Sequence, residues 1–306
     1  MADSLTTVDC DYVQPRVACA YLRVSKGECA FVETNTAHAV PRLLAALAAQ
    51  GRRPEDVRYV IITHVHLDHA GGASALMAAC PNATLLAHPR AARHVTDPTK
   101  LIAGATAVYG AERFRELYGE ITGVDASRVR ALDDGATVEF GGGALSFHHA
   151  RGHANHHFVV RDPAVDAVFT GDAFGLVYPR LQRAGLMAFP STSPTDFDGP
   201  AARAAVEQIV AMGSRSVCLT HYGEQTQVKE IAAQLHEWLT LSEALVAEAR
   251  GVPEAAREGF ISERLEAEFD ARAARVGLTL DEGDRALIEL DRALNAQGLA
   301  YAASKE

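Results

Sequence analysis

The stretch VRYVIITHVHLDHAGG occupies residues 57–72 and joins an apolar run to a cluster of polar side chains. Its first half is rich in β-branched residues and predicts a buried strand. Residues two apart in an extended chain point to the same side, so we expect His64 and His66 to face one point. Asp68 and His69 follow where the chain turns into the next helix, and we expect them to face a second point nearby.

This cluster has the chemistry of a metal site. Imidazole and carboxylate groups are the ligands that Zn²⁺, Fe and Mn²⁺ favour, and no thiol lies among them. A lone histidine is more often a surface residue or a hydrogen-bonded core group. Four compact polar side chains at the end of a buried strand, however, are costly to desolvate unless a partner such as a metal satisfies them.

Three further motifs follow in the order Arg151-Gly152-His153, Thr170-Gly171-Asp172 and Thr220-His221-Tyr222. Together with His-x-His-x-Asp-His after a strand, they resemble the metallo-β-lactamase superfamily over roughly residues 15–225. The combination is specific, whereas Gly-His or Gly-Asp alone would mean little. One departure is that Arg151 stands where the family commonly has proline, although the histidine of that motif is kept.

The resemblance implies a four-layer αββα sandwich that holds two divalent metal ions, most simply Zn²⁺, with Fe or Mn as alternatives. It assigns one ion to His64, His66 and His153, the other to Asp68, His69 and His221, and a bridge between them to Asp172. Zinc β-lactamases of the commonest class carry cysteine at the bridging position. The aspartate here instead resembles the glyoxalase II, lactonase and phosphodiesterase branches.

The function implied is that of a metal-dependent hydrolase. Two cations sharing a water lower its pKa and supply a bridging hydroxide as nucleophile, which would cleave an ester, thioester, lactone or related bond of a small molecule. Asp68 is the candidate catalytic residue, because a carboxylate there can also orient the hydroxide or pass a proton. Two alternatives stay open: an oxidoreductase with a single iron, similar to persulfide dioxygenases, and a non-catalytic effector that keeps the metal site.

Several other side chains are weaker candidates. Loops that follow catalytic strands usually carry specificity, so residues 174–194 form a predicted pocket wall. The candidate substrate-pocket residues are Tyr178, Arg180 and Tyr222. Metal-bound imidazoles usually donate their other N–H to an oxygen or a similar partner. The candidates for such outer partners are Thr63, Asp134 and His157. Tyr222 could instead brace its loop, and His157 could be an ordinary strand-edge residue.

The order of elements predicts an α/β catalytic domain over residues 1–225 and a helical C-terminal segment over 226–306. Periodicity alone does not choose between two sheets and one open sheet. We expect one helix over 98–120, weakened by its glycines, and a capping box from Thr279 to Glu282 that opens the last helix. The helical segment would serve either as a cover for the pocket or as a homodimer interface.

Composition limits the partners. The chain has 306 residues and a formal net charge of −10, which argues against nucleic acid, since phosphate binding needs a basic stripe. No apolar run approaches the ~20 residues that cross a bilayer, and no secretory signal is visible. The five cysteines are scattered and read as buried thiols. We therefore expect a cytoplasmic protein that acts on a small-molecule substrate, with no membrane partner.

Overall fold

The structure is a computed structural model that describes residues 3–192 and 196–305. It divides into two compact units, each of which is discontinuous in sequence. Unit 1 comprises Met1–His149, His156–Gly171 and Ser214–Thr226; unit 2 comprises Ala150–Asn155, Asp172–Gly213 and Gln227–Glu306. The helical tail from Gln227 onward belongs to unit 2 together with two internal segments.

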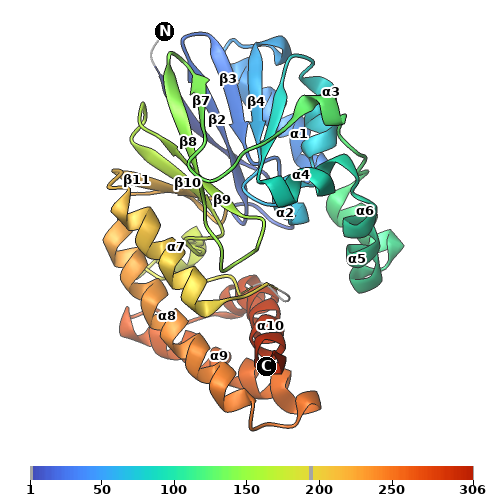
Figure 1. Ribbon diagram of the computed structural model, residues 1–306. Helices are drawn as coiled ribbons and strands as arrows, with labels where there is room; N and C mark the ends of the chain where they lie inside the picture. The colour runs from blue at the N-terminus through green and yellow to red at the C-terminus, as the bar shows by residue number, and fades with distance from the viewer. Residues whose placement is uncertain (1–2, 193–195, 306) are drawn as a thin grey trace. The chain divides into compact units, whose positions relative to one another are not determined.

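Unit 1 contains two six-stranded sheets (Figure 1). The first sheet has the order β1 (Ser4–Asp9), β2 (Cys19–Ser25), β3 (Glu28–Val32), β4 (Val57–Ile61), β5 (Thr84–Ala87) and β6 (Val129–Ala131). The second has the order β12 (Gly223–Gln225), β11 (Ser216–Leu219), β10 (Ala167–Gly171), β9 (Phe158–Asp162), β8 (Gly143–His149) and β7 (Thr137–Phe140). Strands β3 to β6 are parallel, as are β10 and β11, and the other neighbours are antiparallel. The two-sheet architecture implied by the resemblance is confirmed.

Alternating side chains of the first sheet enter two different cores, because successive residues of a strand point to opposite faces. Tyr21 and Ile61 pack with Phe147 and Phe169 of the second sheet. Their neighbours, such as Leu22, instead pack against helices on the other face. These helices are α1 (Val40–Ala49), α2 (Leu67–Ala70), α3 (Ala73–Ala79) and α4 (Pro89–Thr96). Burial on both faces explains why these strands read as continuous apolar runs.

The helix expected over residues 98–120 is two helices, so that prediction was wrong in its continuity. Helix α5 (Thr99–Tyr109) and helix α6 (Ala111–Tyr118) are separated by Gly110, whose φ of 78° breaks the helical path. A positive φ is accessible to glycine at little cost, whereas other residues avoid it. Short 3₁₀ turns complete the unit at Ala37–Ala39, Pro54–Asp56 and Ala126–Arg128.

Unit 2 contains helices α7 (Gly199–Ala211), α8 (Val228–Ala249), α9 (Arg257–Arg275) and α10 (Glu282–Ser304), with 3₁₀ turns at Pro179–Gln182 and Glu254–Ala256. The segment 172–213 belongs here because its backbone is tied to the tail. The N–H of Ala188 donates to the side chain of Gln234 on α8, at 2.8 Å. This hydrogen bond is one of the contacts that connect the segment to α8 within unit 2.

The predicted capping box of the last helix lies two residues too early. The N-cap is Asp281, whose side chain accepts from the N–H of Asp284 at 2.8 Å, while Asp284 accepts from the N–H of Asp281 at 3.0 Å. Asp281 has the extended backbone that an N-cap requires, and its carboxylate caps at least as well as the hydroxyl of Thr279.

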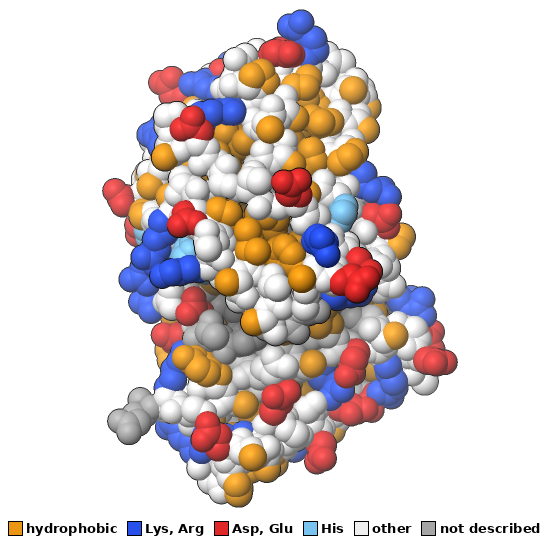
Figure 2. All heavy atoms as spheres, turned by 90° about the vertical axis from the view of Figure 1, so that its right-hand side faces the viewer, with side chains coloured by type: hydrophobic (Ala, Val, Ile, Leu, Met, Phe, Trp, Pro, Cys, Tyr) orange, Lys and Arg blue, Asp and Glu red, His pale blue; other side chains and the backbone are white. Residues whose placement is uncertain are grey.

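Surface and thiol features complete the description. On the face drawn in Figure 2, acidic and basic side chains are interspersed rather than separated by sign. All five cysteines are buried and free, which confirms their interpretation as buried thiols. Within residues 3–192 and 196–305, no helix combines the length and apolar character needed to span a membrane.

Candidate metal centre

The first two histidines follow strand β4 and meet as expected from an extended chain. Nε2 of His64 lies 2.9 Å from Nδ1 of His66. His66 has extended backbone angles and is the N-cap of α2, so the chain turns into the helix only after it. His64 is fully buried. The two rings therefore present nitrogen atoms to one another at the end of a buried strand.

A second group forms where α2 approaches the end of β11. Oδ2 of Asp68 lies 3.3 Å from Nε2 of His221 and 3.7 Å from Nε2 of His69. One ligand atom from each of these three residues falls within 4.8 Å of the others. Residues far apart in sequence thus converge within unit 1 on a point where a single cation could contact all three.

The Nδ1 atoms of His221 and His64 contact oxygen atoms of the surrounding protein. Nδ1 of His221 faces the carbonyl oxygen of Val17 at 2.9 Å. Nδ1 of His64 faces Oγ1 of Thr63 at 3.1 Å. Such outer contacts fix the orientation of a ring and leave Nε2 for a metal. The donor set of imidazole and carboxylate, oriented in this way, fits a divalent cation.

Glu33 is a buried carboxylate at this centre that we did not predict from the sequence. Its Oε1 lies 3.3 Å from Nδ1 of His69 and also accepts from the hydroxyl of Thr63. It follows strand β3, the parallel neighbour of β4, and its φ is 67°. The sequence did contain a signal for this residue. Glu33 stands at the end of an apolar strand, and the neighbouring strand ends in histidines.

The residues after Glu33 hold the backbone of the ligands. Oγ1 of Thr34 donates to the carbonyl oxygen of His69 at 2.8 Å. The side-chain amide of Asn35 donates to the carbonyl oxygen of Asp68, also at 2.8 Å. The loop after β3 therefore positions both the side chain and the main chain of this part of α2.

Unit 2 carries the remaining two predicted ligands. Nε2 of His153 lies 3.4 Å from Oδ2 of Asp172, and both side chains are at most 7% exposed. Nδ1 of His153 faces the carbonyl oxygen of Ser191 at 3.0 Å, so this ring has the same arrangement as the rings in unit 1. A small hollow beside the pair is lined by apolar residues including Phe197 and Leu239.

The predicted substrate-pocket residues have other partners in the structure. The buried ring of Tyr178 packs on Phe189, with centroids 5.8 Å apart. Arg180 forms ion pairs with the two carboxylates that cap α10. Tyr222 lies under the guanidinium of Arg16, 5.6 Å from its ring centroid. Of the predicted pocket wall, Ser193 and Pro194 lie outside the described residues.

His157 and Asp134, two of the residues proposed to contact the ligand rings from outside, have different surroundings. His157 is buried, and its ring stacks on His64 with centroids 4.8 Å apart. Oδ1 of Asp134 accepts from the backbone N–H of His149 at 2.8 Å. It stands at the turn before β7, where a carboxylate commonly satisfies a backbone donor.

Comparisons with known proteins agree with this architecture. The model of the Metallo-beta-lactamase superfamily matches residues 15–214. An archaeal protein of that superfamily from Sulfolobus tokodaii is similar over 98% of this chain and 99% of its own, with a TM-score of 0.68 and 18% identity. A metallo-beta-lactamase family protein from Thermus thermophilus is similar over 80% of this chain and 82% of its own, with a TM-score of 0.60 and 22% identity.

A third similar structure is the metallo-beta-lactamase SMB-1 bound to 2-mercaptoethanesulfonate. It covers 78% of this chain and 96% of its own, with a TM-score of 0.54 and 20% identity. At these sequence identities, the similarity to the three solved structures concerns the fold. The family match spans about two thirds of the chain and includes the motifs that carry His64 to His69, His153 and Asp172. The chain belongs to the metallo-beta-lactamase superfamily.

Proposed function

We propose that the protein is a metal-dependent hydrolase that cleaves an ester, thioester or lactone bond of a small molecule, as in the glyoxalase II and lactonase branches. The observation that carries the proposal is the convergence of Asp68, His69 and His221, whose ligand atoms lie within 4.8 Å of one another. The imidazoles are fixed from outside by Glu33 and the carbonyl of Val17, which is how metal-binding histidines are held.

The proposed ligands are the seven residues of the motifs: His64, His66, Asp68, His69, His153, Asp172 and His221. The assignment of Asp172 to both ions rests on the family resemblance. Two divalent ions, Zn²⁺ in the simplest case, would supply Lewis acidity and lower the pKa of a shared water. The protein's own contribution is to orient the imidazoles and to place the carboxylate of Asp68 where it can hold or pass a proton.

The ligand chemistry and the charge support this substrate class. The residue proposed to bridge the two ions is an aspartate, so the zinc β-lactamase pattern with cysteine does not apply. The formal charge of −10 disfavours a polyanionic substrate such as a nucleic acid, because phosphates are attracted by basic surfaces. A small, weakly charged carbonyl compound fits these conditions.

The test combines metal analysis with a substrate screen. Protein purified without added metal is analysed for zinc, iron and manganese and then assayed on ester, thioester, lactone and phosphodiester compounds. We expect two ions per chain and hydrolysis of one carbonyl class. His221→Ala should lose both metal and activity, whereas the control His38→Ala, which removes an exposed imidazole that contacts the carbonyl of Arg115, should keep both.

Two outcomes would contradict the proposal. One iron per chain, with sulfite formed from a persulfide, would make the protein an oxidoreductase. A His64→Ala variant that loses metal but retains the cellular function would instead make it a non-catalytic effector.

A further inference from the structure

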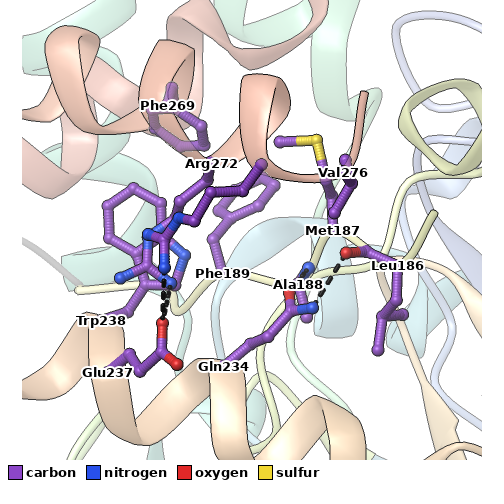
Figure 3. Close-up of a pocket in the computed structure, with 11 residues that line it drawn as sticks. Leu186, Met187, Ala188, Phe189, Gln234, Glu237, Trp238, Phe269, Arg272 and Val276 are labelled. Atoms are coloured by element: carbon purple, nitrogen blue, oxygen red, sulfur yellow. Dashed lines mark hydrogen bonds and ion pairs between the residues drawn. The ribbon is translucent and has the colours of Figure 1, made fainter. Parts of the chain in front are cut away.

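Unit 2 contains a cavity of about 180 Å³ between the segment 186–189 and helices α8 and α9 (Figure 3). Its apolar walls come from Met187, Phe189, Trp238 and Phe269, none of them more than 4% exposed. Val276, at the end of α9, lies at its rim. Three aromatic rings and a thioether therefore surround a space that the hydrolase proposal does not use.

The aromatic walls support one another. The ring of Phe269 lies edge-on to Phe189, with centroids 5.0 Å apart, and tilted against Trp238 at 4.9 Å. These are favourable aromatic arrangements, and each ring limits the rotation of the next. The walls are therefore preformed, which lowers the ordering cost that a ligand would otherwise have to offset.

The backbone on the opposite side is also fixed. The side chain of Gln234 accepts from the N–H of Ala188 and donates to the carbonyl of Leu186, both at 2.8 Å. Both hydrogen bonds connect this segment to α8, and the bond to Leu186 is drawn in Figure 3. The backbone wall of the cavity is therefore held in place, as the aromatic walls are.

The charged residues at this cavity neutralise one another. Arg272 covers the ring of Trp238 at 4.4 Å and pairs with Glu237 at 3.1 Å and Glu268 at 2.7 Å. Arg275 pairs with the same two carboxylates, at 3.3 and 3.2 Å. Two cations and two anions cancel, and an ionic ligand would have to break one of these pairs. The polar rim therefore favours an uncharged ligand.

We propose that this cavity binds an uncharged aromatic or branched aliphatic group of a small molecule. An apolar cavity of about 150 Å³ in another protein accommodates benzene, so the volume here suffices for one ring or a short branched chain. The group belongs either to the hydrolase substrate or to a separate ligand. The cavity lies within one unit and involves none of the proposed metal ligands, so binding can be measured without metal.

Trp238 makes the test direct, because it is the only tryptophan of the chain and lines the cavity. The metal-free protein is titrated with benzyl alcohol and 3-methylbutanol while tryptophan fluorescence is recorded. We expect a saturable change, with benzoate and benzylamine binding at least tenfold more weakly. Val276→Phe, which fills the rim, should weaken binding at least tenfold. Val252→Phe makes the same change outside the cavity lining and should bind as the wild type does.

A second variant protects the test against a folding defect in Val276→Phe. Met187→Ala enlarges the cavity and should shift the preference towards larger probes such as 4-tert-butylbenzyl alcohol. Equal binding in the wild type and both cavity variants would overturn the proposal, as would tighter binding of the charged probes. Competition between benzyl alcohol and a substrate of the metal-loaded enzyme would assign the group to the substrate; its absence would assign it to a separate ligand. Failure of the hydrolase proposal would leave the metal-free titration unchanged.

Discussion

Oε1 of Glu33 lies 3.3 Å from Nδ1 of His69, and both side chains are buried. The same carboxylate accepts from the hydroxyl of Thr63, which in turn lies 3.1 Å from Nδ1 of His64. One carboxylate thus acts on two imidazoles of the proposed centre. A carboxylate held against an imidazole in this way orients the ring and fixes which nitrogen faces inward.

Removing this carboxylate should weaken metal binding without removing a ligand. We expect Glu33→Ala to lower metal affinity about 10- to 100-fold, the range found when outer partners of metal ligands are lost. Competition with a chromogenic chelator measures this affinity. The control Glu139→Gln changes an exposed carboxylate of β7 and should leave it unchanged. If Glu33→Ala bound metal as tightly as the wild type, the role of Glu33 would be structural only.

We expect a side chain at Gly171 to clash with Thr63 and His157, which belong to the same buried group as Glu33. Its φ is 49°, and an added Cβ would lie 2.4 Å from Oγ1 of Thr63 and 2.6 Å from Nε2 of His157. Gly135 also has a positive φ, 75°, but nothing lies within 4 Å of its Cβ position. Gly135→Ala should therefore cost only the backbone strain, about 1–2 kcal/mol.

Gly171→Ala adds a steric clash to the same strain, so it should lower the free energy of unfolding by clearly more than Gly135→Ala does. Overpacking of a buried site typically costs a further ~1–3 kcal/mol. Urea denaturation of both variants measures the difference. Equal losses would show that Thr63 and His157 move aside at no cost.

Asp172→Asn tests the proposed bridging role. The amide removes a negative charge that would be shared by both ions, so we expect both to be lost together rather than one. Asp172 lies 3.4 Å from His153, so His153→Ala serves as a comparison that removes a ligand of one ion only. Metal stoichiometry after dialysis decides the matter, and retention of one full equivalent in Asp172→Asn would refute the bridge.

The metal-ligand motifs were predictable because they depend on short-range geometry. His64 and His66 are two residues apart on extended chain, and the apolar run before them marks a strand without any knowledge of the fold. The carbonyl of Val17 that faces His221 is 204 residues away, and the carbonyl of Ser191 that faces His153 is 38 residues away. A backbone oxygen carries no side-chain signal, so tertiary structure alone reveals these partners.

The break between α5 and α6 was harder to place for a related reason. A glycine within a helical pattern weakens the helix without specifying whether the chain turns there, and Gly104 stays helical while Gly110 ends α5. Local sequence gives the propensity of each glycine, and packing decides which of them breaks the helix.

His88 should make stability depend on pH. Burial, together with the neighbouring His149, lowers the pKa of His88 from 6.5 to about 4. Its Nδ1 also accepts from the N–H of Arg90 at 3.0 Å, which requires the neutral ring. Because the unfolded chain binds the proton more readily, this contribution is present above pH ~6.5 and is lost as the pH falls towards 4, by about 2 kcal/mol between pH 7 and 5.

His88→Asn keeps a side chain that can cap α4 and removes the titration. Its unfolding free energy should therefore fall less than that of the wild type between pH 7 and 5. Urea denaturation at the two pH values measures the difference, and the exposed His38→Asn serves as the control. Parallel losses in wild type and His88→Asn would place the pH dependence elsewhere.

Arg180 should act on stability rather than on substrate. Its Nε and Nη2 donate to Asp284 and Asp281, both at 2.8 Å, and Arg183 pairs with the same carboxylates. The hydrogen bond from Arg183 is the largest influence on Asp284 and lowers the pKa of this carboxyl to about 2. Asp284 is fully buried and also completes the cap of α10, so it depends on these partners.

Arg180→Ala should destabilise the protein only slightly, because the arginine is half exposed and Arg183 remains. Asp284→Ala removes the shared acceptor and half of the capping box, and should cost about 3 kcal/mol. Thermal unfolding of the two single variants and of the double variant gives their coupling energy. A residue that only connects residues 179–183 to α10 has no direct effect on substrate binding. Arg180 would therefore belong to the substrate pocket if Arg180→Ala raised KM, left the melting temperature unchanged and showed no coupling to Asp284.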